Sequence, residues 1–318
     1  MGYLMHSFLF KLVLTVIFSI FIGYLLAQIE FKEGNYSFRK ILGEQKKEVR
    51  GDEELEGKIR DFLEGKEGDY AVYVKDLKPE GSRNVYINSD QVYEAASLYK
   101  LFLMAATFEA VNRGEIALDT EISAKLSHLE EVLGSVDYGY QHLSKDEVAT
   151  YTVRECLDRI ARISDNYASI MLAEKVGWDG AQDVANEIGA LNTTIKTPIS
   201  TSAEDVGLLL EKIYSGEIAS FEASEEIISM LEKAQINDRI PAKLPKGVRI
   251  AHKTGELSRV RNDAGIVFLE GNPSGKAASS AYVIVMMTKN LKGEDAGIEN
   301  LAEISKIVYD YYQSSKTN

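Results

Sequence analysis

Residues 97–114 read SLYKLFLMAATFEAVNRG, and this stretch guides the interpretation of the rest of the chain. Its apolar run predicts a buried helix that begins near Ser97 and stops near Gly114. On such a helix Ser97 and Lys100 lie one turn apart on the same face. A serine hydroxyl needs a nearby base to act as a nucleophile, and burial lowers the pKa of a lysine enough for its neutral amine to be that base. The alternative is a serine at a helix start followed by a surface lysine.

The pattern stays helical to about residue 232, and a second polar motif lies inside this block. Ser164-Asp165-Asn166 connects two amphipathic helices. As a plain connection, its Ser or Asp would cap the next helix. As a functional motif, Ser164 would relay a proton toward a leaving group, and the Asn166 amide would hold a substrate carbonyl or orient Lys100.

Strand-like segments flank the helical block at both ends of the chain. They alternate and are rich in Val and Tyr, and they lie at 69–77, 83–88, 248–255, 262–271 and 280–290. Helices are expected at 53–63 and 298–313, before and after these strands. This order predicts an α+β fold: one antiparallel sheet of about five strands from both chain ends, covered by the terminal helices, with an all-helical insert at about 97–240.

A third motif, Lys253-Thr254-Gly255, lies at the end of the strand predicted over 248–255. A cation and a hydroxyl at a strand edge can hold a substrate carboxylate, and a glycine lets a ligand backbone approach closely. The alternative is a strand that runs into a turn. The neighbouring His252 is expected to be a structural residue of the strand.

Together the three motifs resemble the Ser-x-x-Lys, Ser-Asp-Asn and Lys-Thr-Gly set of serine β-lactamases and penicillin-binding proteins. Their order is the same, and so are their contexts: a helix start, an interhelical connection and a strand end. The resemblance covers residues 52–318 and is closest to the class A β-lactamases, because Val260 to Ile266 is similar to the strand that follows the third motif there. It implies a β-lactamase-like three-layer α/β/α sandwich.

The resemblance also implies a role for each motif residue. Ser97 would attack a β-lactam or peptide carbonyl to give an acyl-enzyme, Lys100 would be the base or relay, and Ser164 would pass a proton to the departing nitrogen. The backbone N–H groups of Ser97 and Glu256 would hold the oxyanion, at about 3 kcal/mol or more per donor. Lys253 and Thr254 would engage the substrate carboxylate. The residues expected to bind the substrate are Asn166, Lys253, Thr254, Gly255 and Glu256.

The chain departs from the class A pattern between the second and third motifs. Class A enzymes carry a loop glutamate there that activates the deacylating water, but the stretch from Ala190 to Ala203 contains no acidic residue. The nearest one, Glu204, follows Thr201 by three residues and precedes an apolar run, which is the pattern of a helix capping box. Acylation with slow deacylation is therefore expected.

Three functions remain open at this point. The first is a β-lactamase-like serine hydrolase that opens the β-lactam amide bond. The second is a D-alanyl-D-alanine carboxypeptidase or related penicillin-binding protein that acts on peptidoglycan peptides, and the absent glutamate favours it. The third is an inactive homologue that binds cell-wall fragments.

Composition argues against several other classes of function. Thirty-six Lys plus Arg against 49 Asp plus Glu give a net charge of -13, which repels nucleic acid. The single cysteine, Cys156, excludes an internal disulfide and is expected to be a small core residue, and the four scattered His show no zinc spacing. We expect no metal or other cofactor, a small-molecule β-lactam or peptidoglycan peptide as the partner, and a monomer.

An apolar segment near the amino terminus, from Phe8 to Ala27, is interrupted only by Lys11 and a few small polar residues. A helix of about twenty residues crosses a bilayer core of about 30 Å. Residues 1–28 are therefore expected to be a transmembrane anchor or uncleaved signal, and 29–51 a polar tether to a catalytic domain at 52–318. Because β-lactams and peptidoglycan are found outside the cytoplasmic membrane, the domain is expected at the cell surface or in the periplasm.

Overall fold

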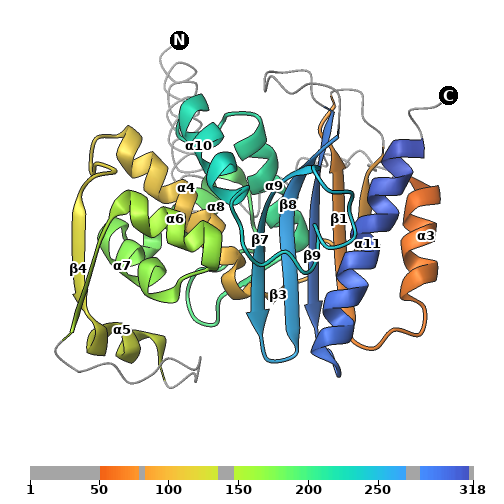
Figure 1. Cartoon of the computed structure of the whole chain (residues 1–318), viewed down its shortest axis with the longest axis horizontal. Helices are drawn as coiled ribbons and strands as arrows, with labels where there is room; N and C mark the ends of the chain where they lie inside the picture. Colours follow the sequence, from red (N-terminus) through yellow and green to blue (C-terminus); the bar gives the residue numbers. More distant parts are fainter. Residues whose placement is uncertain (1–50, 79–82, 135–146, 270–279, 315–318) are drawn as a thin grey trace, which may run out of the picture. The chain divides into compact units, whose positions relative to one another are not determined.

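A five-stranded antiparallel sheet lies at the centre of the fold in the computed structural model, which describes residues 51–78, 83–134, 147–269 and 280–314 (Figure 1). The strand order is β2-β1-β9-β8-β7. The strands are β1 (Asp69–Asp76), β2 (Val85–Ile87), β7 (Arg249–Leu257), β8 (Val260–Phe268) and β9 (Ala281–Lys289). Because β9 pairs with β1 over the whole length of β1, the two ends of the chain complete one sheet. The predicted sheet is confirmed.

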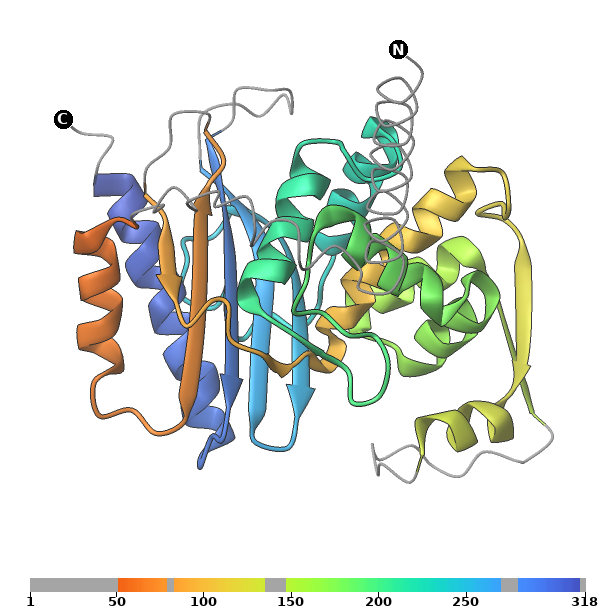
Figure 2. The same ribbon diagram turned by 180° about the vertical axis from the view of Figure 1, so that it is seen from behind.

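Helices cover both faces of this sheet. The terminal helices α3 (Glu53–Leu63) and α11 (Glu294–Ser314) lie on one face, and α9 (Ala203–Tyr214) lies on the other (Figure 2). Side chains of a strand alternate between its two faces. Ile284 of β9 accordingly belongs to the core beneath α3 and α11, while its neighbours Val283 and Val285 belong to the core beneath α9. Two cores on one sheet make the three-layer α/β/α sandwich that was predicted.

The helical block beside the sheet is built around α4 (Tyr99–Asn112), which is buried over most of its surface. The other helices of the block are α5 (Leu126–Leu133), α6 (Val153–Ile163), α7 (Asn166–Val176), α8 (Trp178–Ile188) and α10 (Phe221–Leu231). Cys156 on α6 is fully buried, as predicted.

The prediction that this block is all helical is wrong in two places. Strands β4 (Glu121–Lys125) and β5 (Val148–Thr152) form an antiparallel pair inside the block, and the short strand β6 (Ser200–Thr201) pairs with β3 (Tyr93–Glu94), which precedes the block. The cross-strand contact between Ser123 Oγ and Thr150 Oγ1, at 2.8 Å, shows the polar character of the first pair. Such segments carry little apolar alternation, so their pairing partner decides their conformation.

The start of α9 differs by one residue from the predicted capping box. The cap is Ser202, whose Oγ accepts a hydrogen bond from the Asp205 backbone N at 3.1 Å. Thr201 lies in β6 instead, and Glu204 lies in the first turn of α9. The predicted pairing of Thr201 with Glu204 was therefore wrong, because the chain at Thr201 is held as a strand by its pairing with Tyr93.

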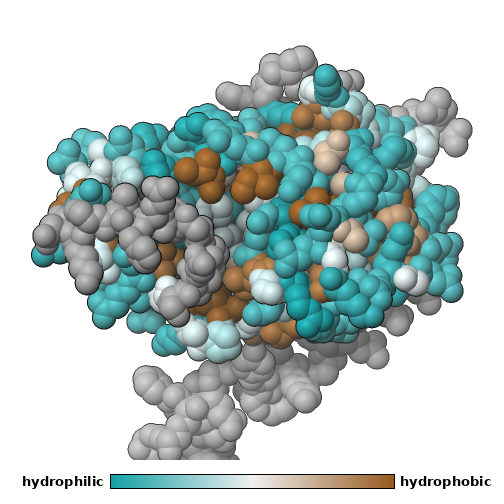
Figure 3. Space-filling view, turned by 60° about the horizontal axis from the view of Figure 1, so that its bottom comes forward, coloured by the Kyte–Doolittle hydropathy of each residue, from teal (hydrophilic) through white to brown (hydrophobic). Residues whose placement is uncertain are grey.

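The surface is mainly hydrophilic on the face shown in Figure 3, where hydrophobic residues gather toward the middle of the view. Of the described helices, none has the length and apolar character needed to cross a bilayer. The predicted anchor at 1–28 and tether at 29–51 lie outside the described residues, except for Gly51.

Candidate active site

Ser97 lies in a single 3-10 turn, η1 (Ala96–Leu98), that leads directly into α4. The α-helix thus begins two residues later than the sequence suggested. The turn is held by the Leu98 backbone N, which donates to the Ala95 carbonyl at 3.0 Å, and Ala96 adopts a left-handed φ of 47°. Strand β7, at the edge of the sheet, packs on this turn.

Gly255 makes the close packing of β7 on the turn possible. A Cβ at Gly255 would lie 3.2 Å from Ala95 O, 3.2 Å from Ala96 Cβ and 3.2 Å from the Ser97 backbone N. The sequence suggested that this glycine lets a ligand backbone approach. In the structure the backbone that approaches it is the protein's own, at the residue predicted to be the nucleophile.

Lys100 is fully buried and points at the second motif. Its Nζ donates to the Ser164 carbonyl at 2.7 Å and to Asn166 Oδ1 at 2.7 Å, and it lies 3.4 Å from Ser164 Oγ. Burial holds the pKa of Lys100 well below its usual range, and the charge of Lys253 lowers it further, while Asp165 opposes the shift. A lysine in this environment gives up its proton more readily than an exposed one, which suits it to act as a base.

The second motif is both a helix cap and part of the site. Asp165 caps α7 by accepting from the Ala168 backbone N at 3.0 Å, and its other oxygen accepts from Arg159 Nε at 2.8 Å. The capping alternative is therefore correct for Asp165. Ser164 ends α6 with a left-handed φ of 58°, and the turn brings Ser164 and Asn166 to Lys100.

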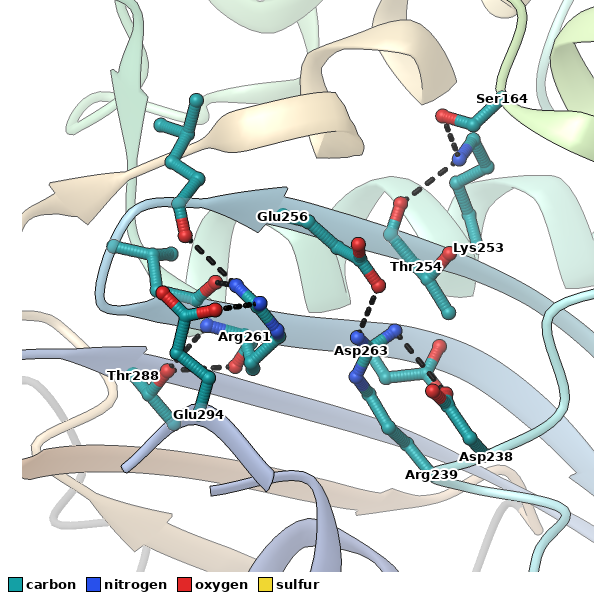
Figure 4. A network of polar contacts seen from close by, with 12 residues as sticks. Ser164, Asp238, Arg239, Lys253, Thr254, Glu256, Arg261, Asp263, Thr288 and Glu294 are labelled. Carbon is teal, nitrogen blue, oxygen red and sulfur yellow. Dashed lines mark hydrogen bonds and ion pairs between the residues drawn. The ribbon is translucent and has the colours of Figure 1, made fainter. Parts of the chain in front are cut away.

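Lys253 approaches the same serine from the sheet. Its Nζ donates to Ser164 Oγ at 2.7 Å and to the Thr254 carbonyl at 2.8 Å (Figure 4). Burial lowers the pKa of Lys253 to about 7; Asp263 and Glu256 raise it, and Arg239 lowers it. Two buried lysines from different motifs thus converge on Ser164, one at its carbonyl and one at its hydroxyl.

Arg239 is a further residue of the site that sequence reasoning missed. Its side chain is completely buried and pairs with Glu256 of β7 and, at 3.3 Å, with Asp238 (Figure 4). The surrounding sequence, INDRIP, is polar and follows no period, so it gave no sign that this arginine is buried. Its cation lies close enough to Lys253 to affect the pKa of that amine.

A chain of buried hydrogen bonds holds the segment that carries Arg239 against β7 and β8. His252 Nδ1 lies 2.9 Å from Asp263 Oδ1, and His252 Nε2 lies 2.9 Å from Asn237 Oδ1. Asp263 also accepts from the Ile240 backbone N at 3.0 Å. The segment around Arg239 is therefore tied to β7 and β8, and the structural interpretation of His252 fits its burial.

The loop before α9 is fixed by a buried carboxylate. Asp205 accepts from the Asn192 backbone N and from Thr193 Oγ1, both at 2.7 Å. Its carboxylate is thereby engaged in holding the loop, and the acid-free stretch from Ala190 to Ala203 runs between these anchors. In the part of the chain that the structure describes, no group of three or more His, Cys, Asp or Glu side chains is arranged to hold a metal ion.

Comparison with known proteins gives one consistent answer. A model of the β-lactamase enzyme family matches residues 54–312. The structure of PBP-A is 27% identical to this chain, with a TM-score of 0.71 over 83% of this chain and 98% of PBP-A. A mutant of PBP-A, in an acyl-enzyme complex with penicillin G, gives a TM-score of 0.72 at 27% identity over 84% and 98%. A class A β-lactamase from Bacteroides cellulosilyticus gives 0.69 at 25% identity over 83% and 99%. No curated protein sequence matches the chain.

Proposed function

The chain belongs to the β-lactamase enzyme family, and from that premise we propose that it is a serine hydrolase that forms an acyl-enzyme on Ser97. The observation that supports this most is the convergence of Lys100 and Lys253 on Ser164, both at 2.7 Å. Ser97 lies one turn before Lys100 and against β7 at Gly255. Residues of all three motifs therefore lie around a single site.

The proposed reaction begins with the Ser97 hydroxyl, which attacks the carbonyl of a β-lactam while the neutral Lys100 amine takes its proton. The backbone N–H groups of Ser97 and Glu256 stabilise the oxyanion. When the C–N bond breaks, Ser164 gives its proton to the departing nitrogen and recovers one from Lys253. The Asn166 amide, whose Oδ1 accepts from Lys100, offers its N–H to a substrate carbonyl.

We propose that deacylation is slow. The stretch from Ala190 to Ala203 contains no acidic residue to activate water, and the carboxylate of Asp205 is buried and occupied by Asn192 and Thr193. The same observation favours a second candidate function, a D-alanyl-D-alanine carboxypeptidase of the penicillin-binding type. The similarity to PBP-A is compatible with it.

Intact-mass spectrometry of the purified full-length chain after addition of benzylpenicillin tests the acyl-enzyme. We expect one retained penicillin per chain, and none in Ser97→Ala. Ser123→Ala, which removes a hydroxyl from strand β4, is the matched control and should be labelled like the unaltered chain. Equal labelling of Ser97→Ala, or no labelling of the unaltered chain, would overturn the proposal.

The rate at which the penicillin adduct is lost and the rate at which D-alanine is released distinguish a β-lactamase from a carboxypeptidase. A β-lactamase loses the penicillin adduct within seconds to minutes and releases the opened product. A carboxypeptidase keeps the adduct and releases free D-alanine from a peptide that ends in D-alanyl-D-alanine. We expect the second pattern, because water has no acidic group in the loop to activate it.

We further propose that residues 1–28 anchor the protein and that the catalytic domain lies outside the cytoplasmic membrane. This is supported by the apolar sequence from Phe8 to Ala27 and by the location of the substrates. Protease added to intact spheroplasts should degrade the domain while a cytoplasmic marker survives. Protection of the domain under those conditions would contradict the proposed location.

A further inference from the structure

The cationic end of the site contains a carboxylate of the protein itself. Thr254 and Glu256 are two residues apart on β7, so their side chains project from the same face of the strand. Figure 4 shows the Glu256 carboxylate directed at the guanidinium of Arg239. The Arg239 side chain is 0% exposed, whereas that of Glu256 is 46% exposed. A half-exposed anion thus covers a buried cation.

Each cation at this position already lies near carboxylates of the protein. The cations are Lys253 and Arg239, and the anions that lie near them are Glu256, Asp238 and Asp263. An anionic group of a substrate is attracted by a cation that lacks its own counter-ion. Since the Glu256 carboxylate already pairs with Arg239, it would repel a second carboxylate beside Thr254.

We infer that Glu256 is a specificity-determining residue: its carboxylate occupies the cationic subsite beside Thr254 and reduces the advantage that a substrate's free carboxylate has there over an uncharged carboxamide or ester. The inference rests on the proposed function and names a determinant of its substrate preference. It concerns the Glu256 side chain alone, because the backbone N–H of Glu256 is independent of side-chain identity.

The physical basis is competition for one guanidinium. A substrate carboxylate must either displace Glu256 from Arg239 or bind next to it, and both cost free energy that an uncharged group does not. Displacement remains feasible because half of the Glu256 side chain already faces solvent. The effect is therefore a bias in affinity and acylation rate, and carboxylate substrates still react.

A pair of probes that differ only in this charge tests the inference: a chromogenic cephalosporin with its free carboxylate, and the methyl ester of the same compound. In Glu256→Gln the second-order rate of acylation by the acid should rise roughly tenfold, while that by the ester stays within about twofold. Glu294→Gln is the matched control, because Glu294 also pairs with an arginine, Arg261, but on the adjacent strand away from the site (Figure 4). It should leave both rates unchanged.

The outcomes separate this inference from the proposed function. If both probes acylate Ser97 but the ratio of their rates is the same in Glu256→Gln and the unaltered chain, the inference alone is wrong. If neither probe acylates Ser97, the proposed function is wrong. Calorimetry with N-acetyl-D-alanine and its amide, which requires no reaction, then decides about Glu256: tighter binding of the acid to Glu256→Gln supports the inference, and unchanged binding refutes it. Glu256→Ser provides a second neutral variant, with thermal melting as the check on folding.

Discussion

Replacing Gly255 by alanine is the sharpest test of how β7 positions Ser97, the proposed nucleophile. The new Cβ would lie 3.2 Å from Ala95 O, Ala96 Cβ and the Ser97 backbone N. Carbon atoms pack best at about 3.5–4.0 Å, so the contacts are too short by about 0.3 Å or more. None of the three atoms is the tip of a flexible side chain. The turn that carries Ser97 and strand β7 must therefore move apart.

The size of the effect follows from what lies at this contact. Overpacking of this kind costs about 1–3 kcal/mol of folding free energy. The two proposed oxyanion donors, the N–H groups of Ser97 and Glu256, lie on opposite sides of the contact, so separating the elements weakens both. Complete loss of one such donor slows reaction by about 10²–10³-fold. A displacement of a fraction of an ångström should cost less, and we expect acylation to slow roughly 10- to 100-fold.

Stopped-flow acylation with a chromogenic cephalosporin measures the rate, and denaturant unfolding measures the stability. The matched control is Gly57→Ala in α3, where a Cβ would meet no atom within 4 Å. That variant should gain up to about 1 kcal/mol from helix propensity and acylate normally. If Gly255→Ala acylated at the rate of the Gly57→Ala control, the role assigned to the β7 contact would be refuted.

Three further predictions concern other parts of the molecule. Lys100→Met removes the proposed base and should slow acylation by about 10²–10⁴-fold, measured in the same stopped-flow assay. Because the pKa of Lys253 is about 7 in the folded chain, acylation by a carboxylate substrate should fall as pH rises through 7. The free energy of unfolding should rise from there to about pH 10, since the unfolded chain binds the extra proton in that range. Gly207→Ala should lose about 3 kcal/mol or more in denaturant unfolding, because its Cβ would overlap the Tyr73 ring.

Each of these predictions has an outcome that contradicts it. Lys100→Met with an unchanged acylation rate would exclude that lysine as the base. If the acylation rate depended on pH in the same way for the acid and its ester, Lys253 would have no role in carboxylate recognition. Unaltered stability of Gly207→Ala would mean that α9 does not pack on Tyr73 as described.

The sequence was informative where a local pattern and the final structure agree. Helix α3 was predicted with its observed bounds, because Leu55 and Ile59 form an apolar stripe and Asp52 caps the first turn through Leu55 N, at 3.0 Å. The strands of the sheet were predicted because these segments alternate and are rich in Val and Tyr. The motif residues could be found because the three short motifs, in their order, resemble a set known from serine β-lactamases and penicillin-binding proteins.

The structure was needed where a residue's environment comes from distant parts of the chain. Arg239 lies in a polar segment that gives no sign of burial, and only its placement beside β7 turns it into a buried cation paired with Glu256. Strands β4 and β5 pair across 22 or more residues and carry too little apolar alternation to be recognised.

The sequence by itself therefore determined the family of the fold and the chemical types present: a serine, a lysine, a second serine and a second lysine, in that order. Only the tertiary structure decided that Lys100 and Lys253 meet at Ser164, which is 64 residues from one and 89 from the other. The reason is physical. Packing of the buried helix α4 against the helical block and the sheet brings these amines out of water and together, and that desolvation lowers the pKa of both.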